Sequence, residues 1–82
     1  MAQLRIRYFA AAAEAAGTGE EYWECSDGLT LADLASELVA RHGEPLARVL
    51  AVSSFLVDGT VRRDGGPITG TTVDVMPPFA GG

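Results

Sequence analysis

One segment of this 82-residue chain has the periodicity of a core helix, and it limits what the rest can fold into. Thr30 is a favourable N-cap, Asp33 suits the positive end of the helix dipole, and Gly43 is a favourable C-cap. Between the caps, apolar side chains recur every three or four positions: Leu31, Leu34, Ala35, Leu38 and Val39. A short chain with one long amphipathic helix must cover that apolar stripe with other elements. We therefore expect one main helix packed on one face of a sheet.

Two segments before this helix alternate with the period of two of a half-buried strand. In residues 3–10, the face with Leu4, Ile6 and Tyr8 opposes the face with Arg5, Arg7 and Phe9. Residues 20–26 also alternate, and we expect them to pair with the first strand, so that Arg5 or Arg7 faces Glu20 or Glu24. An alanine-rich run that ends at Gly17 predicts a short helix between the two strands.

The segments after the main helix contain a further turn and three more strands. Pro45 can open a short helical turn, and Asp58-Gly59 is a favoured two-residue turn between the strands of a hairpin. In the last strand, Val73 and Val75 oppose Asp74 and Met76, and two prolines then end it. The order predicts an α+β fold with a mixed sheet over residues 1–76, followed by a flexible, extended tail of residues 77–82.

The composition argues against several classes of function. Eleven acidic residues against six arginines and no lysine give a net charge of -5, which disfavours nucleic acid as a partner. A single cysteine forms neither an internal disulfide nor a multi-cysteine metal site, so we expect no bound metal. The N-terminus lacks the layout of a signal peptide, and no apolar stretch approaches the length of a membrane helix. We expect a cytoplasmic protein that does not enter the membrane.

The last six residues have the properties of a probe that carries a carboxylate. Pro77 and Pro78 hold the chain extended, and Phe79 is suited to anchor in a partner. Ala80, Gly81 and Gly82 have little or no side chain and can enter a channel too narrow for other residues. An ionised carboxylate is a poor electrophile, so chemistry at Gly82 requires activation, for which adenylation by ATP is the general route. Attack by a persulfide sulfur would then yield a thiocarboxylate.

Several motifs together resemble a known family. The opening "RIRYFAAAAEAAG", the helix start "TLADLASEL", the segment "FLVDG" and above all the ending "DVMPPFAGG" are similar to the MoaD/ThiS sulfur carriers. Within that family, the chain resembles the small subunits of molybdopterin synthase. The resemblance extends over essentially the whole chain and implies a ubiquitin-like β-grasp fold.

The resemblance also implies a function. Gly81 and Gly82 match the family's terminal pair, Pro77 and Pro78 match its diproline, and Phe9 and Met76 lie next to its partner-binding apolar surface. It implies that a ubiquitin-activating-like enzyme uses ATP to adenylate Gly82, which becomes a thiocarboxylate. The tail then enters the large subunit of molybdopterin synthase and donates sulfur to a pterin precursor. The carrier binds no cofactor itself, and the catalytic side chains are expected on the large subunit.

Three alternatives stay open at this point. The carrier can serve another pathway, such as cysteine, thiamine thiazole or a secondary metabolite; it can be a ubiquitin-like covalent modifier; or it can be an interaction module with an inert tail. Elsewhere in the chain, the sequence favours structural roles. We expect Cys25 to be a buried, inert thiol, His42 to be neither ligand nor base, and Gly65-Gly66 to lack the following helix that a phosphate-binding loop requires.

Overall fold

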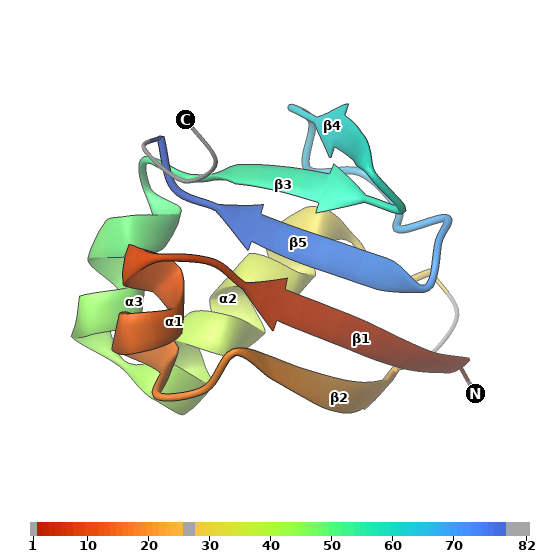
Figure 1. The fold of residues 1–82 in the computed structure, drawn as a ribbon. Coiled ribbons are helices and arrows are strands. Elements are labelled where there is room, and N and C mark those ends of the chain that lie inside the picture. The colour runs from red at the N-terminus through yellow and green to blue at the C-terminus, as the bar shows by residue number, and fades with distance from the viewer. Residues whose placement is uncertain (1, 26–27, 79–82) are drawn as a thin grey trace.

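A five-stranded mixed sheet forms the centre of the computed structural model, which describes residues 2–25 and 28–78. Its strands are β1 (Ala2–Tyr8), β2 (Glu20–Cys25), β3 (Ser54–Val57), β4 (Thr60–Arg62) and β5 (Thr72–Met76). They lie in the order β2-β1-β5-β3-β4, with β1 and β5 parallel and the other neighbours antiparallel. The first and last strands of the chain are therefore neighbours at the centre of the sheet (Figure 1).

Three helices accompany the sheet: α1 (Ala11–Ala16), α2 (Leu31–His42) and α3 (Glu44–Leu50). Helix α2 crosses behind the sheet, whereas α1 and α3 lie together at one end of it (Figure 1). The predicted caps of α2 are present. The Thr30 hydroxyl accepts a hydrogen bond from the Asp33 amide at 3.0 Å, and Gly43 ends the helix with a φ of 86°, which favours glycine. No helix in the described part of the chain is long and apolar enough to span a membrane.

The core lies between the sheet and α2, and the sequence alternation predicts which side chains enter it. Leu4, Ile6 and Tyr8 of β1 are buried, while Arg5, Arg7 and Phe9 are not, as the period of two requires. On α2 the fully buried positions are Leu34 and Leu38. The complete set of buried hydrophobic residues is Leu4, Ile6, Tyr8, Ala12, Leu31, Leu34, Leu38, Leu46, Val57, Val73 and Val75.

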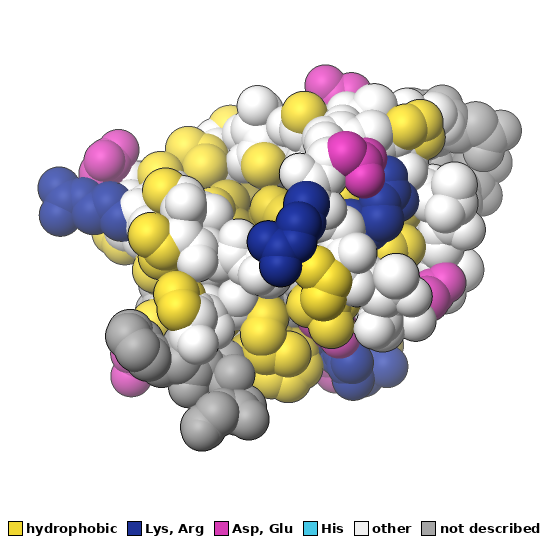
Figure 2. Space-filling model, turned by 90° about the horizontal axis from the view of Figure 1, so that it is seen from above, with side chains coloured by type: hydrophobic (Ala, Val, Ile, Leu, Met, Phe, Trp, Pro, Cys, Tyr) yellow, Lys and Arg dark blue, Asp and Glu magenta, His cyan; other side chains and the backbone are white. Residues whose placement is uncertain are grey.

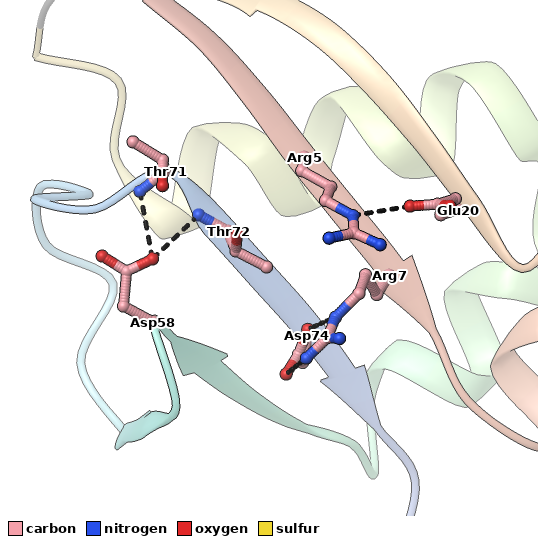
Figure 3. Close-up of polar contacts among 7 residues, drawn as sticks. All are labelled: Arg5, Arg7, Glu20, Asp58, Thr71, Thr72 and Asp74. Atoms are coloured by element: carbon pink, nitrogen blue, oxygen red, sulfur yellow. Dashed lines mark hydrogen bonds and ion pairs between the residues drawn. The ribbon is translucent and has the colours of Figure 1, made fainter.

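The β3–β4 hairpin is joined by the predicted Asp58-Gly59 turn. Both residues have positive φ, 48° and 85°, as a two-residue turn of this twist requires. The Asp58 carboxylate also accepts hydrogen bonds from the amides of Thr71 and Thr72, at 3.2 and 3.0 Å (Figure 3). The turn thus fixes the start of β5, the strand that leads to the tail.

Candidate functional site

The C-terminal tail begins at the end of a central strand. β5 ends at Met76, Pro77 is buried against the domain, and Pro78 is exposed. The remaining predicted tail residues, Phe79, Ala80, Gly81 and Gly82, lie outside the described residues, so their roles and the boundary at residue 76 stay predictions. The structure does fix the root of the tail, because both neighbours of β5 hold it in register.

Phe9 lies next to this root. Its amide donates a hydrogen bond of 3.2 Å to the Val75 carbonyl, which continues the β1–β5 ladder beyond Tyr8. Met76 is the next residue of β5, and Ser54 of β3 lies opposite it. Phe9 and Met76 are both partly exposed. The two residues that the sequence proposed for a partner surface therefore lie close to the point where the tail leaves the sheet.

A charged pair occupies the middle of the same sheet face, the open face that carries no helix (Figure 1). The Arg7 guanidinium donates two hydrogen bonds to Asp74, from Nε to Oδ1 at 2.6 Å and from an Nη to Oδ2 at 2.8 Å (Figure 3). Asp74 is 4% exposed, and its burial is tolerable because this paired geometry satisfies both oxygens. Arg7 thus does not bond to Glu20 or Glu24; the expected pairing across β1 and β2 is made by Arg5 and Glu20, at 2.6 Å.

Apolar side chains of β3 and β4 lie to one side of this ion pair on the open face. Leu56 lies opposite Asp74 across β3 and β5, and Val61 lies opposite Leu56 on β4. Val61 is 47% exposed, which is high for a large hydrophobic residue. The Arg7 guanidinium lies 5.5 Å from the centre of the Phe9 ring, so it links the charged pair to the root of the tail.

Figure 2 views the molecule from the β3–β4 side and shows hydrophobic side chains gathered where this edge meets the open face. We call Phe9, Leu56, Val61 and Met76, with the Arg7–Asp74 pair, the partner face. Sequence patterns did not single out Leu56, Val61 or Asp74. The sequence shows how side chains alternate along each strand, but it does not show which strands lie beside β1 in the sheet.

The other side of the sheet carries a polar cluster at the start of β2. Glu21 accepts hydrogen bonds from the Tyr8 hydroxyl at 3.1 Å and the Trp23 indole at 2.6 Å, and its two oxygens lie 3.2 Å from His42 Nε2. Burial by itself raises the pKa of Glu21, but the hydrogen bonds from His42, Trp23 and Tyr8 outweigh it, so the pKa is lowered. Burial beside Glu21 raises the pKa of Tyr8. We interpret the cluster as a structural connection between β1, β2 and α2.

The remaining sequence predictions concern Cys25, the Gly65-Gly66 pair and metal binding. Cys25 is partly buried and packs against the core. The Gly65 and Gly66 carbonyls accept from the amides of Ala32 and Leu31, so this pair closes onto the first turn of α2. In the described residues, no three His, Cys, Asp or Glu side chains are grouped to hold a metal.

Comparison with known protein families shows to which family the chain belongs. The profile of the ThiS family matches residues 6–82, which include the end of β1, every later element and the tail. The chain belongs to the ThiS family. It is therefore a member of the ubiquitin-like sulfur carriers, as the motifs predicted. No curated protein sequence matches the chain.

Solved structures agree with this assignment. A candidate molybdopterin converting factor, subunit 1, from Pyrococcus furiosus has 28% identity and a TM-score of 0.78, with 95% of this chain and 99% of that one covered. Small archaeal modifier protein 1 from Haloferax volcanii has 24% identity and a TM-score of 0.75, with 98% and 99% covered. The corresponding modifier from Methanosarcina acetivorans has 21% identity and a TM-score of 0.68, with 100% and 98% covered. The two modifiers support the fold alone, and the predicted ubiquitin-like β-grasp architecture is confirmed.

Proposed function

We propose that this ThiS-family protein carries sulfur as a Gly82 thiocarboxylate and donates it to a pterin precursor, as the small subunit of molybdopterin synthase. Family membership supports the carrier role. The observation that favours the pterin pathway is the likeness to the Pyrococcus protein, which is named as a subunit of a molybdopterin converting factor and matches along nearly its whole length.

The proposed chemistry takes place at the C-terminal carboxylate. A carboxylate oxygen of Gly82 attacks the α-phosphate of ATP on an activating enzyme, and pyrophosphate leaves. A persulfide sulfur of a donor protein then attacks the acyl carbon and AMP leaves, which gives an acyl disulfide. A second thiol attacks the donor's sulfur of that disulfide, so that the thiocarboxylate leaves and the two thiols end as a disulfide. A glycine suits this position because no Cβ hinders attack at its carbonyl. The protein itself is a co-substrate, and the acid–base groups belong to its partners.

The partner face supports this role because it combines a recognition surface with the root of the tail. Phe9, Leu56, Val61 and Met76 offer apolar area, and the Arg7–Asp74 pair places fixed charge at its centre. We propose that the activating enzyme and the large subunit both contact this face while the tail, through Phe79, Ala80, Gly81 and Gly82, enters their active sites.

Mass spectrometry of the intact protein tests the proposal. The protein is incubated with ATP, a sulfur source and an activating enzyme of the ubiquitin-activating type, and we expect one terminal oxygen to be replaced by sulfur. Because oxidation of Met1 or Met76 gives nearly the same mass change, fragmentation must assign the sulfur to Gly82. A protein that lacks Gly82 is the matched control. An unmodified tail in the presence of an enzyme that charges another carrier would contradict the sulfur-carrier role.

A covalent modifier is the second candidate, because the chain ends in a glycine pair and shares its fold with the small archaeal modifier proteins. In that case the same adenylate would form an isopeptide bond with a lysine of a target protein. The chain has no lysine, so it offers no side-chain amine for chains of itself. High-mass conjugates in cells that disappear when Gly82 is deleted would favour this function over sulfur donation.

A further inference from the structure

The edge strand β2 has backbone amides and carbonyls that point away from the sheet. The Tyr8 amide donates to the Gly19 carbonyl at 2.8 Å, which makes Tyr8 and Gly19 a hydrogen-bonded pair of the antiparallel ladder. Such pairs alternate with pairs whose backbone groups point away. Glu20, Tyr22 and Glu24 therefore turn their amides and carbonyls outward. The Glu20 carbonyl accepts from the Thr18 hydroxyl at 2.9 Å, whereas no described residue bonds to the outward groups of Tyr22 and Glu24.

A groove runs between this edge and helix α2. It has a volume of about 630 Å³ and is lined by Tyr22, Trp23, Glu24, Glu37, Ala40 and Arg41. The Trp23 ring forms an apolar wall, with the Arg41 guanidinium 5.2 Å from the centre of the ring. On the other side of the edge, Tyr22 is 57% exposed. A strand placed along β2 would thus meet an aromatic side chain on each of its two faces.

The charge around the groove indicates which strand fits. Glu24 lies on one side of the edge and Glu37 on the other, and neither forms an ion pair with another described residue. A second copy of this chain fits poorly. Antiparallel pairing of two β2 strands about Tyr22 would place Glu20 opposite Glu24, and like charges directly opposite are destabilising. Because successive residues of a strand face opposite sides, lysine or arginine at two successive positions of a foreign strand would instead meet a carboxylate on each face.

From these observations we propose that β2 is a docking edge for an extended, basic segment of another protein, which adds to the sheet as a sixth strand. Main-chain hydrogen bonds to Tyr22 and Glu24 would provide affinity. An apolar side chain against Trp23 and Ala40, with basic side chains beside Glu24 and Glu37, would provide specificity. The proposal does not depend on the function of the tail, because β2 lies at the far edge of the sheet from β3 and β4 (Figure 1).

Amide hydrogen exchange with a model peptide tests this proposal. The probe is a short peptide in which two lysines alternate with two valines, so that each face of the strand presents both residue types, and the same peptide with glutamate in place of lysine is its control. At saturating concentration we expect the lysine peptide to slow exchange of the Tyr22 and Glu24 amides about tenfold or more, because these amides gain acceptors. Binding without protection of these two amides, or equal binding of the glutamate peptide, would overturn the proposal.

Two variants test the two sources of affinity. The double change Glu24→Lys and Glu37→Lys should weaken binding of the lysine peptide about tenfold, since two attractions become repulsions. Its control, Glu14→Lys with Glu44→Lys on α1 and α3, makes the same change in net charge and should leave binding unchanged.

Tyr22→Pro removes an amide donor that points outward, while β2 keeps its hydrogen bonds to β1, and it should abolish binding. If the Glu14 and Glu44 variant weakens binding as much as the groove variant, or if sedimentation shows that β2 pairs with a second copy, the proposal fails.

Discussion

At the scale of single residues, Glu21 has a role that its place in the sequence does not reveal. Its carboxylate joins side chains of β1, β2 and α2 through Tyr8, Trp23 and His42. A partly buried carboxylate with several donors is stabilised as an ion, so its pKa is lowered in the folded state. The free energy of unfolding should therefore depend on pH through this group.

The sign of that dependence follows from the lowered pKa. Glu21 stabilises the fold fully above its unfolded pKa of about 4.3, and this contribution is lost as the pH falls through the lower, folded value. We expect Glu21→Gln to be less stable than the natural protein at pH 7, with the difference shrinking below about pH 4. Urea unfolding of both proteins across this range measures it. A difference that does not change with pH would show that the Glu21 charge has no part in stability.

Ala10 is a second informative residue, because its backbone is strained. It has a φ of 49° and a ψ of -125°, a region that residues other than glycine rarely adopt. Ala10→Gly should therefore raise the free energy of unfolding by about 1 kcal/mol, after the entropy that glycine adds to the unfolded chain is subtracted. Ala13→Gly within α1 is the control and should lower stability by about 0.5–1 kcal/mol. Loss of stability in both variants would contradict the strain at Ala10.

At the scale of elements, helix α2 supplies most of the helical contribution to the core. Its residues Leu31, Leu34 and Leu38 are buried, and its Thr30 cap and Gly43 stop fix where that buried stripe falls against the sheet. Short helices α1 and α3 add one buried residue each, Ala12 and Leu46. The stability of the domain should therefore respond strongly to changes on the buried side of α2.

Leu34 is the position at which this prediction is sharpest, because its exposure is 0%. Leu34→Ala should lower the free energy of unfolding by about 2–5 kcal/mol, through lost burial and the cavity that remains. Ser36→Ala on the exposed side of the same helix should change it by less than about 0.5 kcal/mol. Thermal and urea unfolding of the two variants compares the faces. Equal effects would show that α2 does not pack on the sheet through Leu34.

At the scale of the whole molecule, the core and the proposed partner face lie on opposite sides of the sheet. Helices cover one face, the partner face lies on the other, and the tail leaves from the end of central strand β5. Among the residues that the structure describes, all the buried hydrophobic core residues precede Met76. Stability and sulfur transfer should therefore respond to different parts of the chain.

Deletion of Gly82 separates the two properties. We expect the deletion to abolish sulfur transfer while the melting temperature stays within about 1 °C of the natural protein, because a terminal glycine has no side chain to bury. Mass spectrometry of the charged protein and thermal unfolding measure the two outcomes. Retained transfer would refute the role of Gly82, and a large fall in melting temperature would show that the terminus supports the domain.

The sequence by itself determined the local elements and the family. Periodicity identified α2 and the buried faces of β1 and β5, Asp58-Gly59 predicted the hairpin turn, and the terminal motif indicated a ThiS-family carrier. Tertiary structure alone decided that β1 and β5 are neighbours. That arrangement pairs Arg7 with Asp74, 67 residues apart, and gathers Leu56 and Val61 near the tail. The physical reason is that periodicity reports which way a side chain faces, whereas strand order depends on packing between segments far apart in the chain.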